Sequence, residues 1–110
     1  MRQVGSVSIL DLVGPVTLGE SASQMREALQ KLADGGARNI LVNLRDVSYL
    51  DSSALDELVT AYTALTNAGG RIKLLHPQSI VKQVLQITKL NTVFGTYEDE
   101  TLALESFTAV

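Results

Sequence analysis

The stretch ILVNLRDVSYLDSSAL, residues 40–55, decides the fold of this chain. It begins with an almost unbroken apolar run at residues 40–44, which is typical of a central strand covered on both faces. It ends with Asp-Ser-Ser at residues 51–53, just before an amphipathic segment over residues 55–65. Polar capping residues between such segments predict a strand-to-helix turn, with the two serines at the helix start.

The rest of the chain alternates between strand-like and helix-like patterns. Glycine pairs at residues 35–36 and 69–70 follow two helix-like segments, as expected at helix ends. Residues 5–6 predict a hairpin turn, and residues 14–19 and 45–50 predict connections. Strands are predicted at residues 2–4, 7–13, 40–44, 71–75 and 92–97, and helices at residues 20–33, 52–67, 77–88 and 99–107.

The resulting order is β-β-α-β-α-β-α-β-α. Alternating strands and helices predict an α/β fold, with a mixed, mostly parallel sheet flanked by helices and right-handed crossovers. The 110 residues contain no linker, low-complexity tract or repeat, so a single domain over residues 1–110 is expected.

Composition excludes several classes of function. The net charge of −3 and the scattered Lys and Arg argue against binding to nucleic acid or an anionic membrane. The absence of cysteine excludes disulfides and thiolate sites, and the single histidine excludes a His-based metal cluster. No apolar run approaches the roughly 20 residues that span a bilayer, and no signal peptide is apparent. We therefore expect a cytoplasmic protein that does not insert into membranes.

A serine hydrolase is one hypothesis, with Ser52 or Ser53 as nucleophile and His76 as base. His76 follows the strand at residues 71–75, so both groups would lie at the carboxyl edge of the sheet. However, the chain has no Gly-x-Ser-x-Gly elbow and no glycine-rich anion hole. His76 is better explained as a partly exposed loop residue before Pro77, so this hypothesis ranks last.

Acidic residues cluster around the same turn and raise the question of a cation site. They are Asp46, Asp51, Asp56 and Glu57. The spacing of a calcium loop is absent, and acidic residues in a first helical turn ordinarily interact with the helix dipole. No Walker A sequence occurs either, so neither a metal nor a cofactor is expected.

The two serines have two interpretations from their position alone. They can serve as structural caps, since Ser53 and Asp56 approximate a capping box and Asp51 is itself a good N-cap. Alternatively, one serine can be a phosphorylation site, because a helix start stabilises a phosphate. Capping is the commoner role of such residues.

Residues 44–55, LRDVSYLDSSAL, resemble the signature of STAS domains and, more narrowly, of bacterial anti-sigma factor antagonists. In that family the segment ends in Asp-Ser-Ser/Thr-Gly-Leu at the start of the second helix. Gly14, the strand at residues 39–44 and the segments at residues 67–75 and 85–90 also fall in register. The resemblance covers nearly the whole chain.

The resemblance implies a domain without enzymatic activity in a partner-switching circuit that regulates transcription. Its unphosphorylated form would bind an anti-sigma factor that is also a serine kinase of the histidine-kinase-like ATPase fold. The kinase would phosphorylate the serine after the aspartate and break the complex, and a metal-dependent serine phosphatase would reverse this. The implied acceptor is Ser52, with Ser53 as the weaker alternative.

The resemblance also implies an interaction surface made of the first loop, the Asp-Ser-Ser turn and the exposed face of the second helix. The family often has glycine at the positions of Ala54 and Asp56, and many members have Asp at the position of Thr17. These departures leave open a STAS scaffold in another signalling or transport assembly, without phosphorylation. A free monomer is expected. The implied partner-binding residues are Thr17, Glu20, Asp51, Ser52, Ser53, Asp56, Glu57 and Thr60.

Overall fold

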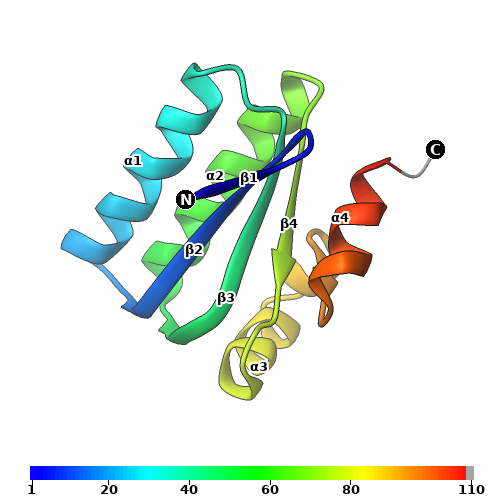
Figure 1. Ribbon diagram of the computed structural model, residues 1–110. Coiled ribbons are helices and arrows are strands. Elements are labelled where there is room, and N and C mark those ends of the chain that lie inside the picture. The colour runs from blue at the N-terminus through cyan, green and yellow to red at the C-terminus, as the bar shows by residue number, and fades with distance from the viewer. Residues whose placement is uncertain (109–110) are drawn as a thin grey trace.

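The computed structural model describes residues 1–108, which form one five-stranded sheet with helices on both faces (Figure 1). The order of elements is the predicted one. The strands are β1 Arg2–Val4, β2 Val7–Val16, β3 Asn39–Leu50, β4 Arg71–Leu75 and β5 Gly95–Tyr97. The helices are α1 Glu20–Asp34, α2 Ser52–Asn67, α3 Ser79–Ile87 and α4 Glu100–Thr108, with a short 3₁₀ helix at Leu90–Thr92.

The sheet has the strand order β1-β2-β3-β4-β5, in which only β1 runs antiparallel to its neighbour. The mixed, mostly parallel sheet is therefore confirmed. In this arrangement β2 and β3 end at the same edge, where α1 and α2 begin (Figure 1). No helix among residues 1–108 has the length and apolar character needed to cross a membrane.

Each face of the sheet has its own core. On one face, α1, α2 and α3 bury apolar side chains such as Met25, Leu58 and Val81 against the strands. On the other face, α4 buries Ala103 and Phe107 against a smaller cluster. The first core is much the larger, so α1 and α2 are the more firmly anchored helices.

Residues 45–50 are the main correction to the sequence prediction, because they continue β3 rather than connecting it to α2. Leu44, Val47 and Leu50 are all fully buried, at intervals of three residues. A regular strand buries every second residue on one face, so this interval does not look like a strand in the sequence.

The pairing of β3 with β2 explains the interval of three. Asp11 pairs with Asn43 and Val16 pairs with Leu50, with two register shifts between these pairs. Residues inserted at β-bulges rotate the strand and restore the same face to the core. The bulges therefore keep β3 in the sheet up to the residue before Asp51.

β2 and the C-terminal elements also depart from their predicted bounds. Gly14 and Pro15 lie within β2 instead of ending it, because Gly14 takes a φ of 80° at a register shift. The strand predicted at residues 92–97 begins only at Gly95, after the 3₁₀ helix. Helix α3 begins at Ser79 rather than at Pro77.

Candidate functional site

Asp51 is the N-cap of α2, and its carboxylate joins two segments of backbone. Its Oδ1 accepts a hydrogen bond from the Ala54 N–H at 3.0 Å, and its Oδ2 accepts one from the Leu18 N–H at 2.8 Å. Leu18 and Ala54 thus hold the pKa of Asp51 below its ordinary value, with the Leu18 bond as the larger cause. The carboxylate fixes the first loop to the start of α2.

The loop at residues 17–19, between β2 and α1, is held by further hydrogen bonds. The Thr17 N–H donates to Ser21 Oγ at 2.9 Å, and Ser21 Oγ donates to the Thr17 carbonyl at 3.1 Å. The Ala22 N–H donates to the same carbonyl at 3.1 Å. Gly19 takes a φ of 108°, which lets the chain turn into α1. The side chain of Leu18 nevertheless remains 79% exposed.

Ser52 and Ser53 are the first two residues of α2, and neither is its cap. The side chain of Asp51 takes that role, so the capping interpretation holds for Asp51 and not for the serines. Ser52 is exposed and Ser53 is half-buried. Within residues 1–108, no side-chain hydrogen bond involves either serine hydroxyl, which leaves both oxygens free for other chemistry.

The other residues of the predicted interaction surface divide into two groups. Glu20 begins α1 and is exposed, and Asp56 is exposed on α2, one turn after Ser52. Glu57 and Thr60 lie farther along α2, where they line a groove between the two helices. The structure thus brings most of the predicted residues to the carboxyl edge but places these two beside the groove.

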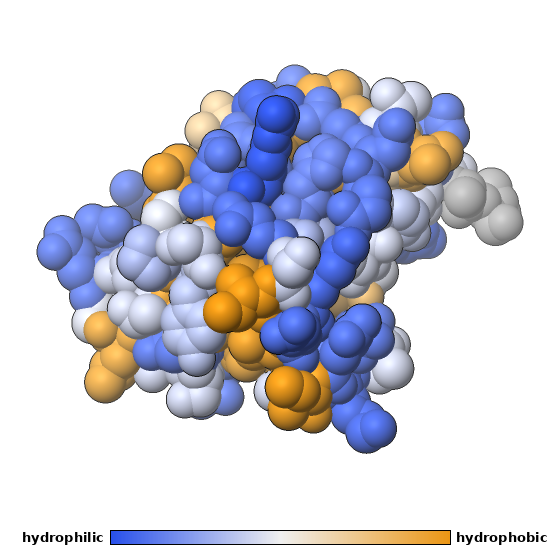
Figure 2. All heavy atoms as spheres, turned by 90° about the horizontal axis from the view of Figure 1, so that it is seen from below, coloured by the Kyte–Doolittle hydropathy of each residue, from blue (hydrophilic) through white to orange (hydrophobic). Residues whose placement is uncertain are grey.

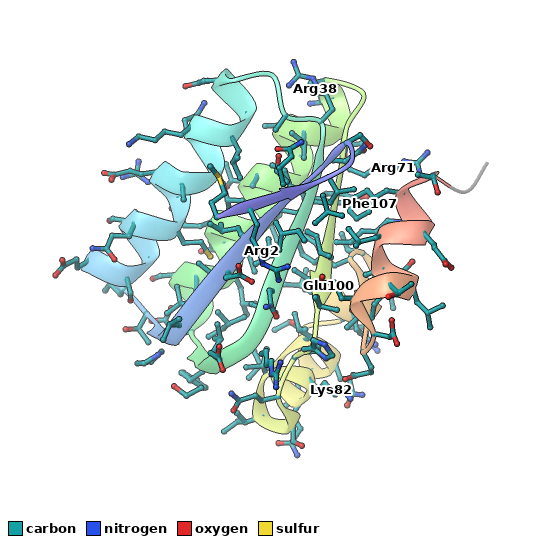
Figure 3. The ribbon with its side chains drawn as sticks, viewed as in Figure 1. Arg2, Arg38, Arg71, Lys82, Glu100 and Phe107 are labelled. Carbon is teal, nitrogen blue, oxygen red and sulfur yellow. The ribbon has the colours of Figure 1, made fainter. Side chains whose placement is uncertain are left out.

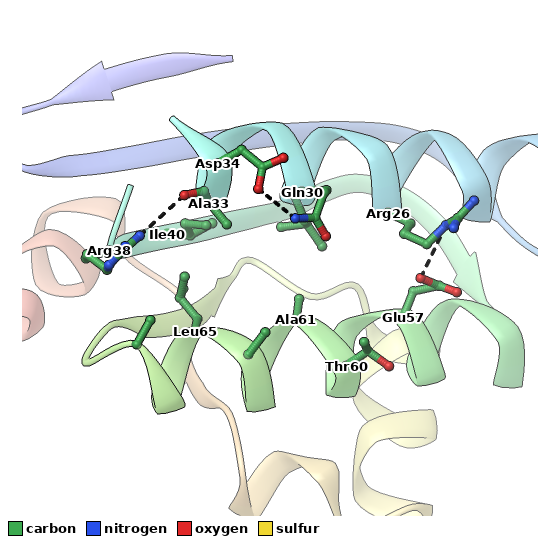
Figure 4. Close-up of a pocket in the computed structure, with 13 residues that line it drawn as sticks. Arg26, Gln30, Ala33, Asp34, Arg38, Ile40, Glu57, Thr60, Ala61 and Leu65 are labelled. Carbon is green, nitrogen blue, oxygen red and sulfur yellow. Dashed lines mark hydrogen bonds and ion pairs between the residues drawn. The ribbon is translucent and has the colours of Figure 1, made fainter. Parts of the chain in front are cut away.

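The groove between α1 and α2 has a volume of about 180 Å³ (Figure 4). At its rim, Arg26 Nε lies 3.7 Å from Glu57 Oε2, and Gln30 Nε2 donates to Asp34 Oδ1 at 2.8 Å. Its lining consists mainly of small or branched apolar side chains: Leu29, Ala33, Ile40, Ala61, Ala64, Leu65 and Ala68.

Figure 2 shows the molecule from below, onto the edge where β2 and β3 end. Apolar side chains emerge there as separate patches between hydrophilic ones. The elements that reach this edge contribute Val13, Leu18 and Ile80, which are 78%, 79% and 49% exposed. Leu18 is absent from the predicted interaction residues, although it is one of two large apolar residues, with Val16, in the predicted connection at residues 14–19.

The hydrogen bond described for His76 lies away from the two serines. His76 follows β4 with a φ of 52°, and its backbone N–H donates to the Tyr97 carbonyl at 2.8 Å. Among residues 1–108 no hydrogen bond links it to Ser52 or Ser53, and no group of three or more acidic or histidine side chains is placed to hold a metal ion.

A second polar cluster lies on the α4 side of the sheet, around Arg2 and Glu100 (Figure 3). Arg2 donates to both carboxylate oxygens of Asp11, at 2.8 and 3.0 Å, and to both of Glu100, at 3.2 and 2.8 Å. Asn43 Nδ2 donates to Asp11 Oδ1 at 2.8 Å. The Arg2 guanidinium is the main cause of a lowered pKa at both Asp11 and Glu100.

Comparison with known sequences identifies the relatives of this chain. The sequence profile of the STAS domain matches residues 1–103. A Thermotoga neapolitana protein, named as a candidate anti-sigma factor antagonist, is 34% identical over 70 residues, which are 64% of this chain and 62% of that protein. The anti-sigma-B factor antagonist of Bacillus subtilis is 34% identical over 73 residues, or 66% of each. The matches thus span less than two thirds of either relative.

Solved structures agree with this relationship. A crystal structure of a candidate anti-sigma factor antagonist from Thermotoga maritima has a TM-score of 0.92 at 25% identity, covering 98% of this chain and 92% of that one. The Bacillus anti-sigma factor antagonist SpoIIAA shares the fold in its unphosphorylated form (TM-score 0.73, 20% identity, 99% and 96% of the two chains). Its phosphorylated form does so too (TM-score 0.74, 21% identity, 96% and 95%). With its fold and nearly its entire length matched, the chain belongs to the STAS domain family.

Proposed function

We propose that the chain is an anti-sigma factor antagonist, which binds an anti-sigma factor with serine kinase activity in a partner-switching circuit that regulates transcription. The names of its relatives support this role. The observation that carries it is Ser52, whose exposed hydroxyl stands at the start of α2 beside a carboxylate that already caps the helix. The proposal places the protein in the cytoplasm, as a monomer when free and without catalytic activity of its own.

Phosphorylation of Ser52 would control the interaction by direct block. It adds about −1.5 to −2 charges and three acceptor oxygens. Because Asp51 already caps α2 and the helix start favours negative charge, the helix would remain folded. The phosphate would instead bring charge and bulk into the docking surface, and a serine phosphatase would restore binding. Each ~1.4 kcal/mol of lost interaction weakens binding ten-fold.

A scaffold without phosphorylation is the second candidate, and Asp56 favours it. Asp56 follows Ser52 by four residues, so both project from the same side of α2. Its exposed carboxylate would repel a phosphate on Ser52. In this case the surface would serve another signalling or transport assembly in a single, permanent state.

The test uses each purified histidine-kinase-like ATPase encoded by the same genome. Binding of the wild-type protein is measured by calorimetry, and the products of incubation with Mg-ATP are mapped by phosphopeptide mass spectrometry. Ser52→Ala and Ser53→Ala are matched variants. We expect one ATPase to bind and to phosphorylate Ser52, with phosphate transfer lost only in Ser52→Ala.

The outcomes separate the two candidates. Binding that falls at least 100-fold after phosphorylation supports the switch. Binding by one of these ATPases without any phosphate transfer supports the scaffold. Absence of binding by every one of them contradicts the proposed role as an antagonist.

A further inference from the structure

Leu18 combines a fixed backbone with an exposed side chain. Its N–H is bound by Asp51, and the residues on either side are held by the Thr17–Ser21 hydrogen bonds and the Gly19 turn. Because Leu18 is 79% exposed, its side chain buries little apolar surface within the fold. The fixed backbone therefore does not serve the packing of this side chain. Such pre-organisation lowers the entropy cost of binding when the side chain enters a partner.

Asp51 connects this leucine to the candidate phosphorylation site. One carboxylate oxygen caps α2 through the Ala54 N–H, and the other oxygen holds the Leu18 N–H. Ser52 is the next residue in the chain after Asp51. The Asp51 carboxylate therefore links Leu18 directly to the residue before the serine, in addition to the backbone bond from the Asp51 N–H to the Val16 carbonyl at 3.3 Å.

We propose that Leu18 is the apolar anchor of the partner interface, and that Asp51 is the positioning residue that presents it. The inference rests on the proposed function. The occupant is the anti-sigma factor kinase, whose surface would offer an apolar recess for Leu18 beside the position that receives Ser52. Leu18 and Ser52 lie at the same edge of the sheet and are joined through Asp51. A partner that receives Ser52 would therefore also contact Leu18.

The experiment is a double-mutant cycle with the ATPase that binds the wild-type protein. Leu18→Ala removes the anchor. Asp51→Ser keeps a good N-cap but lacks the second oxygen that reaches Leu18. Two controls match these changes: Leu102→Ala removes a 59% exposed leucine from α4, and Asp46→Ser removes an exposed aspartate from β3.

We expect Leu18→Ala and Asp51→Ser each to weaken binding by about 10- to 30-fold. In the Leu18→Ala background, Asp51→Ser should add less than a two-fold loss, because its effect passes through Leu18. Both controls should bind within about two-fold of the wild type. In the free protein, Asp51→Ser should speed amide exchange at Leu18 and leave the amides of α2 protected.

Each alternative outcome overturns a defined part of the inference. Wild-type-like binding by Leu18→Ala removes the anchor but leaves the proposed function intact. Fully additive losses in the cycle, or unchanged exchange at Leu18 in Asp51→Ser, remove the positioning role of Asp51. If none of the ATPases binds the wild-type protein, the proposed function itself fails.

Discussion

Asp51 and Asp11 are two carboxylates with lowered pKa values, but they are bound by different kinds of partner. Asp51 accepts hydrogen bonds from backbone N–H groups of Leu18 and Ala54. Asp11 accepts them from the side chains of Arg2 and Asn43. A carboxylate bound by backbone fixes the shape of a loop, whereas one bound by a long, partly exposed arginine only joins two chain segments.

The second arrangement joins the ends of the described chain. Arg2 lies on β1 and Glu100 begins α4, 98 positions away. These charges remain 33–41% exposed, so water and salt weaken their attraction. The Arg2 cluster is therefore expected to affect stability, whereas Asp51 is expected to affect both stability and binding.

The largest effect is expected from Asp51→Ala, which removes the cap and the bond to Leu18 together. We expect the unfolding midpoint to fall by about 5–8 °C in a thermal scan followed by circular dichroism. Asp51→Ser should recover most of that loss, because serine still caps the helix. Equal midpoints for the two variants would show that capping is not the main contribution.

A smaller effect is expected from Arg2→Ala, which removes the ion pairs to Asp11 and Glu100. Because surface pairs contribute about 0.2–1 kcal/mol each, we expect a loss of about 1 kcal/mol in urea unfolding. Lys31→Ala, at an exposed lysine without an ion pair in the described residues, is the control. Partner binding should be unchanged in Arg2→Ala. A loss of binding would contradict the expectation that the Arg2 cluster affects stability alone.

Acid and salt should distinguish the two carboxylates. A carboxyl group with a lowered pKa stabilises the fold above its unfolded pKa, here 3.8 for Asp, and that stabilisation is lost as the pH falls through the folded value. At low salt, Asp11→Asn and Asp51→Asn should each reduce the loss of stability in urea between pH 5 and pH 3. In 0.5 M NaCl, the effect at Asp11 should shrink because its main partner is a cation.

The effect at Asp51 should persist in 0.5 M NaCl, because its donors are neutral N–H groups inside a fixed turn. The measurement is the same pair of urea titrations with and without salt. Equal salt sensitivity at both positions would mean that the two carboxylates stabilise the fold in the same way.

The smallest effect is expected from Glu57→Gln, at a third carboxylate whose charged partner, Arg26, is 3.7 Å away. We expect the free energy of unfolding to change by less than about 0.5 kcal/mol, because exposed pairs of this length contribute little. Arg26→Gln is the matched change on the other side of the pair. A loss above 1 kcal/mol in both variants would show a stronger role for the groove between α1 and α2.

Local patterns in the sequence predicted most of the fold. The apolar run at residues 40–44 and the helical spacing within residues 52–67 identified β3 and α2, because each pattern depends on near neighbours. The prediction was wrong at residues 45–50, where bulges change the periodicity of burial. Such bulges arise from pairing with β2, which the strand's own sequence does not reveal.

The candidate site was predictable in part for the same reason. The capping ability of Asp51 is local, and the resemblance to STAS domains singled out Ser52. The bond between Asp51 and Leu18 joins residues 33 positions apart, and Arg2 and Glu100 are farther apart still. These contacts depend on the order of strands in the sheet, so single-residue patterns do not indicate them.

The bulged half of β3, residues 45–50, joins the regular part of the strand to Asp51. Six residues separate Leu44 from Asp51, and four of them, Arg45, Asp46, Ser48 and Tyr49, are exposed. The number of residues in this segment sets the point at which Asp51 leaves the sheet opposite Leu18. A single-residue deletion in this segment is therefore expected to break the hydrogen bond between Asp51 and the Leu18 N–H, whereas a substitution at one exposed position leaves that bond in place.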